Sequence, residues 1–391
     1  MLSAMQRALF GTVAVWVVGV VVLRATVAPA AACPSIDADG ARLAATRAAA
    51  WIAGGQRADG TYLYEMNRRT GLAADDYNVV RHAGVTMALY QLAAFGDRSA
   101  IATADRGLGY MQANLLRRDD WAAFRDPPTG TIQLGASALM LAALEQRRIA
   151  TSDRGYDALM KEVARFLLVM QREDGAFLAE WLPSNGAPDP SQTSKYATGE
   201  AFWALTLMHD AFPREGWDTP SRKVADYLST RRDTEEGFRF PPWADQWAAY
   251  GLAEMADWPL NDANIAYART LAARFGFLVR IESGRRDTRL SSLLHGRQAR
   301  AAGMGTWVEA LDSLWRLSHA DPRMGDMRTK IGERAACGAG MLTARQAPPT
   351  TAQDKNEAGA WFTNDVTRMD DQQHALSALL RSEAILQTRP R

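Results

Sequence analysis

Apolar residues recur along this chain at helical spacing, in segments of two alternating kinds. The first kind is amphipathic, as in Val163, Phe166, Leu167 and Met170, which share one helix face. The second kind is rich in small and apolar residues on all sides, which is typical of buried helices. One segment of each kind makes a unit, and the unit recurs six times after residue 40. The pattern therefore predicts six consecutive helical hairpins.

The spacing of these units identifies the kind of repeat. Landmarks in the second segments lie 49 to 68 residues apart: Asn78, Ile132, Tyr196, Asp245, Gly303 and Asp371. Two helices and their loops fit this length, whereas the period of tetratricopeptide arrays, about 34 residues, is too short.

We predict an all-α fold in which the hairpins close into a double ring, an (α/α)6 toroid formed by residues 33–391. The outer helices are expected at Asp39–Gln56, Arg98–Leu116, Asp153–Gln171, Thr219–Arg231, Asp262–Val279 and Pro322–Leu342. The inner helices are expected at Tyr77–Phe95, Thr131–Glu145, Lys195–Asp210, Trp243–Met255, Ala301–Leu317 and Met369–Ile385. Function is expected in the cleft where the inner helices begin.

Residues 1–32 have a different character. Arg7 is followed by sixteen uncharged residues, Ala8 to Leu23, then by Arg24 and a run of mostly small residues ending at Ala32. This order is typical of a secretory signal peptide. The segment is also close to the length of an uncleaved signal-anchor helix with Arg7 on the inner side. Both interpretations place the ring outside the cytoplasm, either secreted or held at the cell membrane by a single pass.

The two cysteines agree with export. Cys33 precedes the first outer helix, and Cys337 lies in the last one. These helices are neighbours in a closed ring, so a disulfide would join the two ends of the chain. Two unpaired thiols, or a lipidated Cys33, are the alternatives.

Charge restricts the partners. The net charge is +1, with 45 basic and 44 acidic residues and no basic stripe, so we expect no nucleic acid partner. One long loop, Glu282–Arg300, is rich in arginine and would suit an anionic substrate if it lay at the rim; it contains Arg285, Arg286, Arg289, Arg297 and Arg300. The alternative is that these arginines only form part of the solvated surface.

Two outer helices end in the same motif. Gln56, Gly60 and Tyr62 match Gln171, Gly175 and Phe177 in spacing, and weaker copies stand at 235–238 and 357–361. The glycine suits the left-handed conformation that ends a helix. This Gln…Gly…aromatic repeat resembles that of terpenoid cyclases and prenyltransferases, and the wider plan resembles the (α/α)6 six-hairpin glycosidases, epimerases and polysaccharide lyases. These matches are specific for the architecture only, and a fold does not decide the function.

Histidines suggest one candidate site. His82 and His374 each precede an alanine and follow an Asp-Asp pair, Asp75-Asp76 and Asp370-Asp371. The two inner helices are adjacent in a closed ring, so both imidazoles are expected to approach one cavity. Asp370 and Asp371 lie four and three residues before His374, so a carboxylate can orient its ring and raise its basicity. Asn78 lies four residues before His82. Helix caps and a satisfied core histidine are the structural alternatives.

A second candidate is Glu200, embedded in an apolar helix where burial would raise its pKa, as a general acid requires. The alternative role for Glu200 is structural, as an acid paired with a neighbouring arginine. The predicted catalytic set is Asp76, His82, Glu200, Asp370, Asp371 and His374. The predicted substrate-binding set is Tyr77, Asn78, Arg81, Gln133, Tyr196, Trp243, Asp245, Gln246, Trp307, Trp361 and Gln373.

Reaction classes can be compared on these residues. Glycoside hydrolysis needs two carboxyl groups, and Glu200 could pair with Asp76, Asp245, Asp370 or Asp371. An eliminase or epimerase on a uronic acid needs Arg or an amide beside His or Tyr, which the first and sixth inner helices supply. Asp-x-Asp-Asp and Asp-Asp-x-x-Asp motifs are absent from the sequence, as are nucleotide, zincin and serine-hydrolase motifs.

We therefore expect an exported or membrane-tethered toroid that acts on a cell-envelope polysaccharide, without a metal or cofactor and as a monomer. The resemblance to the six-hairpin glycosidases implies a glycoside hydrolase-like activity. A lyase or epimerase acting on a uronic-acid glycan, a non-catalytic toroid binding glycan or protein, and a terpenoid cyclase-like protein remain alternatives.

Overall fold

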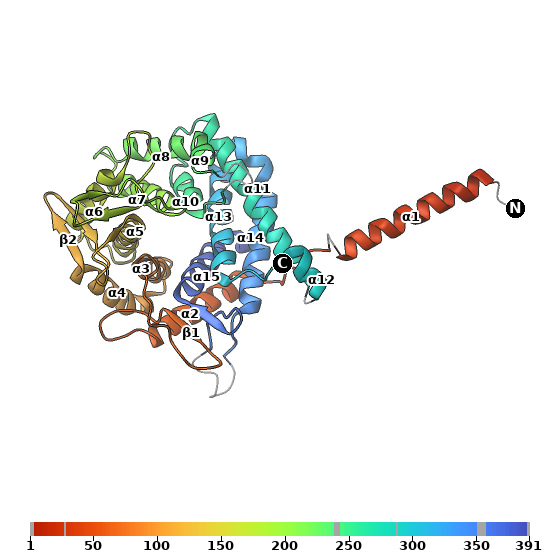
Figure 1. Ribbon diagram of the computed structural model, residues 1–391, viewed down its shortest axis with the longest axis horizontal. Coiled ribbons are helices and arrows are strands. Elements are labelled where there is room, and N and C mark those ends of the chain that lie inside the picture. Colours follow the sequence, from red (N-terminus) through yellow and green to blue (C-terminus); the bar gives the residue numbers. More distant parts are fainter. Residues whose placement is uncertain (1–3, 27–28, 238–242, 287, 350–356, 389–391) are drawn as a thin grey trace.

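The computed structural model describes residues 4–26, 29–237, 243–286, 288–349 and 357–388. Helices form a closed double ring from which one N-terminal helix projects (Figure 1). The predicted all-α toroid is therefore confirmed.

The outer layer consists of six helices with amphipathic or small-residue faces. They are α2 (Ala38–Gly54), α4 (Ile101–Ala113), α6 (Asp157–Met170), α8 (Asp218–Thr230), α11 (Asp262–Gly284) and α14 (Arg328–Arg345). On α6, Val163, Phe166, Leu167 and Met170 are all buried, as their spacing predicted.

The inner layer consists of α3 (Val79–Ala94), α5 (Leu134–Thr151), α7 (Ala197–Ala211), α10 (Gln246–Glu254), α13 (Ala301–Ala320) and α15 (Met369–Arg381). Each packs on the next, and α15 packs on α3, so the ring closes. The order around the ring puts α7 opposite α15 (Figure 1).

Small residues let the inner helices approach one another. A Cβ on Gly305 would lie 2.5 Å from the backbone carbon of His374, and one on Gly135 would lie 2.1 Å from Glu200 Oε2. Contacts below about 3 Å are too close for carbon, so these glycines fix both the helix spacing and the position of the Glu200 carboxyl group.

Several boundaries differ from the predictions because a 3₁₀ turn or a strand replaces helix at the ends. The second outer helix begins as η1 (Arg98–Ala100), and its expected end belongs to strand β2 (Leu115–Arg118). The sixth begins as η2 (Pro322–Met327). The remaining short helices are α9 (Arg232–Glu235), α12 (Arg289–His295) and α16 (Glu383–Gln387).

Short antiparallel strands occur in the loops between the helices. β1 (Glu65–Asn67) pairs with β7 (Val366–Arg368), and β2 pairs with β3 (Trp121–Phe124). β5 (Glu180–Leu182) lies between β4 (Ile132–Gln133) and β6 (Ala187–Pro188). The β1–β7 pair joins the first hairpin to the sixth, which reinforces ring closure.

The Gln…Gly…aromatic motif links neighbouring outer helices. Gln56 Nε2 donates to the Thr103 carbonyl of α4 at 3.0 Å, and Gln171 Nε2 donates to the Pro220 carbonyl of α8 at 3.1 Å. Gly60 and Gly175 have φ of +90° and +93°. At each of these glycines an added Cβ would meet the backbone of the next outer helix.

The last outer helix carries a third copy that sequence reading left incomplete. Gln346 Nε2 donates to the Ala44 carbonyl of α2 at 2.8 Å and to the Gly359 carbonyl at 2.9 Å. Residues 347–356 separate this glutamine from the 357–361 segment, which hides the match. Phe238 of the other weak copy lies outside the described residues.

The N-terminal helix α1 (Ala4–Thr26) projects away from the ring (Figure 1). Its segment Leu9–Thr26 is long and apolar enough to cross a membrane. After it, the chain runs along the ring, and a disulfide joins Cys33 to Cys337, at a sequence separation of 304.

Candidate active site

A cavity of about 780 Å³ lies where the inner helices begin. Five of the six residues that precede these helices line it: Asn78, Gln133, Tyr196, Arg300 and Arg368. Beside the sixth, Asp245, the neighbours Ala244 and Gln246 line it. All six helix N-termini therefore converge on one space, and each contributes partial positive charge.

Glu200 on α7 is the buried carboxyl group of this cavity. Its side chain lies against Gly135 of α5, where the absent Cβ leaves room for it. Burial, and secondarily the negative charge of Asp245, raise the pKa of Glu200 to about 8. A carboxylic acid that stays protonated at neutral pH can donate a proton to a leaving group.

His374 on α15 lines the cavity and is paired with a buried carboxylate. Its Nδ1 lies 3.0 Å from Oε2 of Glu309 on α13, which is fully buried. Burial acts to lower the pKa of His374, but Glu309 and then Asp370 and Asp371 outweigh it, and the net shift is upward. Glu309 thus orients the ring and increases its basicity, which is the arrangement of a histidine that accepts protons.

Asp370 faces the cavity between two arginines. Its Oδ2 lies 3.1 Å from Arg368 Nη2 and 3.4 Å from Arg81 Nε. Its Oδ1 is buried and has no hydrogen-bond partner among the described residues. One carboxylate oxygen is therefore fixed by the arginines, while the other is enclosed without a hydrogen-bond partner from the described part of the chain.

Aromatic and amide side chains complete the walls. Tyr196 and Trp243 meet edge to face with ring centroids 5.3 Å apart, and Trp247 lies 5.8 Å from the His374 ring. The amides that line the cavity are Asn78, Gln133, Gln246 and Gln373, and Trp307 lines it too. Flat aromatic faces with amides between them suit a sugar ring and its hydroxyl groups.

His82 does not reach this cavity, contrary to the expectation from sequence. It is fully buried and faces the outer ring, where Nε2 donates to the Gly107 carbonyl at 2.9 Å. Nδ1 accepts from the hydroxyl group of Tyr77 at 2.6 Å, and that oxygen accepts from the Tyr62 amide at 3.0 Å. Burial lowers the pKa of His82 to about 4, so it is a neutral core residue. Tyr77 belongs to the same structural network.

The two histidines separate because their helices begin at different points. His82 is the fourth residue after the N-cap Asn78, whereas His374 is the sixth after Arg368. Two residues turn a helix by about 200°, so the side chains emerge on opposite faces. The helix starts expected from the sequence, Tyr77 and Met369, put both histidines five residues into a helix, so the difference appears only with the observed starts.

Two other acids that the sequence predicted for the site instead hold the starts of inner helices. Asp371 accepts from the Arg368 and Ala302 amides at 3.0 and 3.1 Å and pairs with Arg300. Asp245 accepts from the Trp247 and Ala248 amides and pairs with the buried Arg232. Neither lines the cavity, because each is used to fix a helix start.

Two further predicted residues lie away from the cavity. Asp76 is exposed in the loop before α3. Trp361 is buried in the wall between α14 and α15, where its Nε1 donates to the Leu342 carbonyl at 2.8 Å. It is the aromatic of the third Gln…Gly…aromatic copy, so its role is packing. Arg81, by contrast, lines the cavity beside Asp370 as expected.

Sequence reading missed Glu309 as a histidine partner and missed Arg274 and Arg368 as lining residues. An acid on an otherwise apolar inner helix was the available signal for Glu309. Of the five arginines in the arginine-rich loop, all of which the structure describes, only Arg300 lines the cavity. Arg285 instead bonds the His295 and Arg297 carbonyls at 2.9 and 2.7 Å, which holds the loop together.

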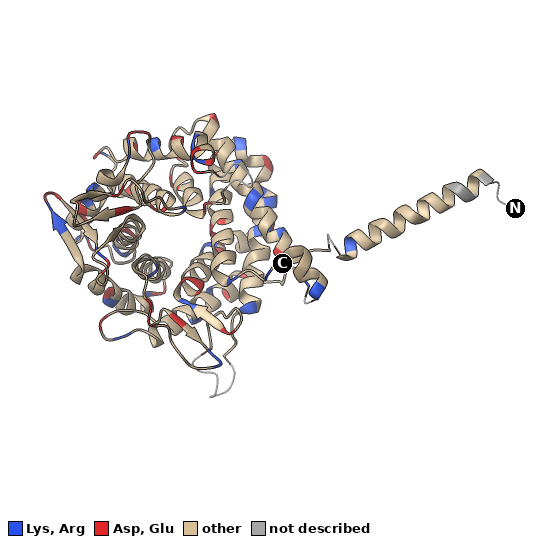
Figure 2. Ribbon diagram, viewed as in Figure 1, with Lys and Arg blue, Asp and Glu red and all other residues tan. Residues whose placement is uncertain are grey.

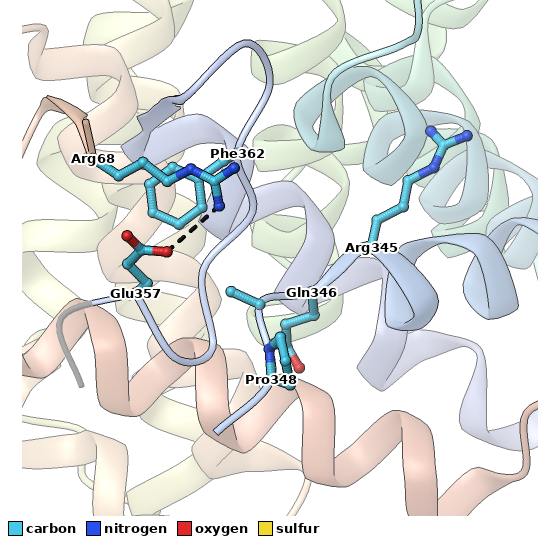
Figure 3. A pocket seen from close by; sticks show the side chains of 7 residues that line it. Arg68, Arg345, Gln346, Pro348, Glu357 and Phe362 are labelled. Atoms are coloured by element: carbon cyan, nitrogen blue, oxygen red, sulfur yellow. Dashed lines mark hydrogen bonds and ion pairs between the residues drawn. The ribbon is translucent and has the colours of Figure 1, made fainter. Parts of the chain in front are cut away.

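A second, smaller hollow of about 360 Å³ lies beside the loop that follows α14 (Figure 3). Arg68 lies over the Phe362 ring and pairs with Glu357, while Arg345 points away from them. Its charged side chains are already paired with one another or, for Arg345, with Glu282. Among the described residues, no cluster of three or more His, Cys, Asp or Glu could hold a metal ion.

Comparisons with known proteins place the fold. No family model and no curated protein matches this sequence. The cellobiose 2-epimerase of Spirochaeta thermophila has a similar structure, with a TM-score of 0.63 at 13% identity over 90% of this chain and 96% of its own. An unsaturated glucuronyl hydrolase specific for heparin has a TM-score of 0.63 at 13% identity, over 89% of this chain and 98% of its own. An α-mannanase from Bacteroides thetaiotaomicron has a TM-score of 0.60 at 9% identity, over 88% of this chain and 95% of its own.

These proteins share the six-hairpin (α/α)6 toroid with this chain. Identities this low establish a common fold and leave the substrate open. The resemblance to terpenoid cyclases rests on the Gln…Gly…aromatic residues alone, and here those residues link outer helices.

Proposed function

We propose that this protein is a carbohydrate-active enzyme that hydrolyses an acidic glycan of the cell envelope. The observation that carries the proposal is the Glu200 carboxyl group, buried in a cavity where its pKa is raised to about 8. The similar structures include hydrolases and epimerases of sugars, which supports a glycan substrate.

In the proposed reaction Glu200 protonates the glycosidic oxygen. Asp370, which lines the cavity from the opposite inner helix α15, accepts a proton from the attacking water. Both carboxyl groups line the same cavity of about 780 Å³ from opposite walls, and inversion at the anomeric carbon needs room for a water between them.

Basic groups of the cavity support an anionic substrate. Arg81, Arg274, Arg300 and Arg368 all line it. Its lining acids are Glu180, Asp370 and the protonated Glu200. Together with six converging helix N-termini, these arginines would bind a carboxylate or another anionic group of the glycan.

A second reaction is favoured by the His374–Glu309 pair. A histidine with a raised pKa beside a cationic anchor could remove a proton next to a sugar carboxylate or carbonyl, as an epimerase or lyase requires. In that case His374 is the base, and Glu309 is its positioning residue.

The site of action follows from α1. A helix that can cross a membrane precedes the disulfide-bonded ring, so we propose that α1 anchors the toroid on the outer side of the cell membrane. Disulfides persist in that oxidising environment.

The test is digestion of acidic envelope polysaccharides by the full chain and by Glu200→Gln, Asp370→Asn and His374→Gln. Glu145→Gln is the matched control, because Glu145 is also a buried acid on an inner helix with a pKa raised to about 8 but does not line the cavity. Hydrolysis predicts a loss of kcat by at least about 100-fold in Glu200→Gln. It also predicts a loss of wild-type activity above about pH 8, as Glu200 deprotonates.

The products separate the alternatives. New reducing ends without ultraviolet absorbance indicate hydrolysis, absorbance of an unsaturated uronate indicates a lyase, and a changed sugar without cleavage indicates an epimerase. Loss in His374→Gln with activity retained in Glu200→Gln would move the proposal to the second reaction. A glycan that binds to the wild type and is never altered would contradict both.

A further inference from the structure

The short helix α12 presents its apolar face to solvent. Leu290, Leu293 and Leu294 are 48%, 81% and 43% exposed. Their spacing of three and four residues puts them on one helix face. Water-facing leucines grouped in this way usually mark an interaction surface.

The polar face of α12 is the one that packs on the protein. Ser291 is buried, and its Oγ accepts from the Arg286 amide at 2.8 Å. The helix therefore has the inverse of the ordinary amphipathic arrangement, and its leucines have no core to enter.

The loop around α12 is held in place. The Arg285 guanidinium pairs with Glu282 at 3.1 Å and bonds the carbonyls of His295, Gly296 and Arg297. These contacts fix the start and the end of the loop to the end of α11, so the leucines are displayed on a fixed support.

The same place on the ring receives the chain that leaves α1. Arg280 donates to the Pro29 carbonyl at 2.5 Å, Arg286 donates to the Ala30 carbonyl at 2.7 Å, and the Ala32 amide donates to the Ser283 carbonyl at 2.7 Å. Figure 1 shows α12 at the rim of the ring beside the base of α1.

This tether is short. Thr26 ends α1, and Pro29 is already bound to α11. Three residues span at most about 10 Å when fully extended. A bilayer that holds α1 must therefore have its surface close to α12.

Charge around the leucines suits lipid headgroups. Arg286, Arg289 and Arg297 are exposed, and Arg24 lies in the last turn of α1. Between residues 281 and 300 the sequence has five arginines and two acids. Of the two acids, Glu282 is buried against Arg285 and Arg345.

We propose that α12 is a second membrane contact, with Leu290, Leu293 and Leu294 entering the outer interface of the bilayer and the surrounding arginines binding anionic headgroups. The inference rests on the proposed anchoring by α1. Two contacts stop the toroid from turning about its tether, so the cavity keeps one orientation to the membrane. Interfacial helices bind by this combination of leucine burial and basic charge.

The test places a fluorescent label on the exposed leucine. Leu293→Cys in the full chain gives one free thiol, because Cys33 and Cys337 are bonded to each other. Leu168→Cys on α6, across the ring from α12, is the matched control. Both proteins are reconstituted in phosphatidylcholine–phosphatidylglycerol vesicles containing nitroxide-labelled lipid, and flotation measures membrane retention.

We expect the label at position 293 to be quenched several-fold more than the label at 168, and the difference to shrink in vesicles of phosphatidylcholine alone. Retention by flotation with equal quenching at the two positions would overturn the α12 contact while leaving the α1 anchor. Loss of flotation would overturn the anchor and the contact together. Shielding of position 293 from aqueous iodide without lipid quenching would assign the leucines to a protein partner, which also overturns the proposal.

Discussion

His82 and His374 show how the surroundings of a residue decide its chemistry. Both imidazoles lie near the start of an inner helix; His82 is fully buried and His374 is partly exposed. One bonds a carbonyl and a phenol, and its pKa falls to about 4; the other faces a carboxylate, and its pKa rises. A charged partner offsets the cost of burying an imidazolium, whereas neutral partners do not.

The structural role of His82 can be tested by His82→Ala. The change leaves the Tyr77 hydroxyl group and the Gly107 carbonyl without a partner and opens a cavity. We expect the free energy of unfolding to fall by about 3 kcal/mol in denaturant titration. Glycan binding by the folded protein should not change. The control His319→Ala, at an exposed position, should stay within about 0.5 kcal/mol of the wild type. An unchanged stability of His82→Ala would contradict this role.

Glu145 predicts a pH dependence of stability. Burial, then Glu254, raises its pKa from 4.5 to about 8 in the folded protein. The folded state therefore binds a proton that the unfolded state releases. The stability that this proton binding contributes is complete below about pH 4.5 and is lost as the pH rises through about 8.

Glu145→Gln should remove that loss. We expect the variant to gain on the order of 2 kcal/mol over the wild type at pH 9 and little at pH 5. Thermal unfolding at both pH values measures the difference. If the stability of the two proteins changed by the same amount between the two pH values, Glu145 would not titrate in this way.

At the scale of elements, the Gln…Gly…aromatic motif connects adjacent outer helices. A Cβ on Gly60, Gly175 or Gly359 would lie 2.3, 2.2 or 2.5 Å from a backbone oxygen of the next outer helix. All three also have positive φ. The motif therefore requires glycine both for its conformation and for the close approach.

Gly216→Ala separates these two effects. Gly216 has φ of +81° with nothing within 4 Å of an added Cβ. We expect it to cost about 1 kcal/mol from strain alone. Gly60→Ala and Gly175→Ala should cost about 3 kcal/mol or more, because α4 and α8 must also shift. Equal losses in all three variants, measured by urea unfolding, would mean that the close approach is unimportant.

At the scale of the whole molecule, the ring is closed by contacts between its two ends. α15 packs on α2 and α3, β1 pairs with β7, and the disulfide joins Cys33 to α14. Basic and acidic residues are interspersed around the ring (Figure 2), so the group of four arginines that line the cavity is a local feature.

Removing the disulfide should loosen this closure. We expect Cys33→Ser with Cys337→Ser to lower the free energy of unfolding by about 3–5 kcal/mol, because the unfolded chain loses a constraint of 304 residues. The wild type with reductant should match the double variant, and reductant should not affect the variant. Identical unfolding of the wild type with and without reductant would contradict the expectation.

The sequence by itself determined the twelve ring helices and their alternation between two layers. Helical periodicity and small-residue patterns are local properties, so they can be read without the fold. It also indicated Glu200, since an acid in an apolar helix is conspicuous wherever that helix packs.

Only the tertiary structure decided which polar residues face the cavity. Whether His82 or His374 turns inward depends on where each helix begins, and a two-residue difference reverses the direction. The pairing of His374 with Glu309 joins helices 65 residues apart in sequence. Asp245 and Asp371 have the sequence positions of site residues, but backbone amides and arginines occupy both carboxylates. Helices are set by neighbours in the chain, whereas an active site is set by side chains that meet only after the ring has closed.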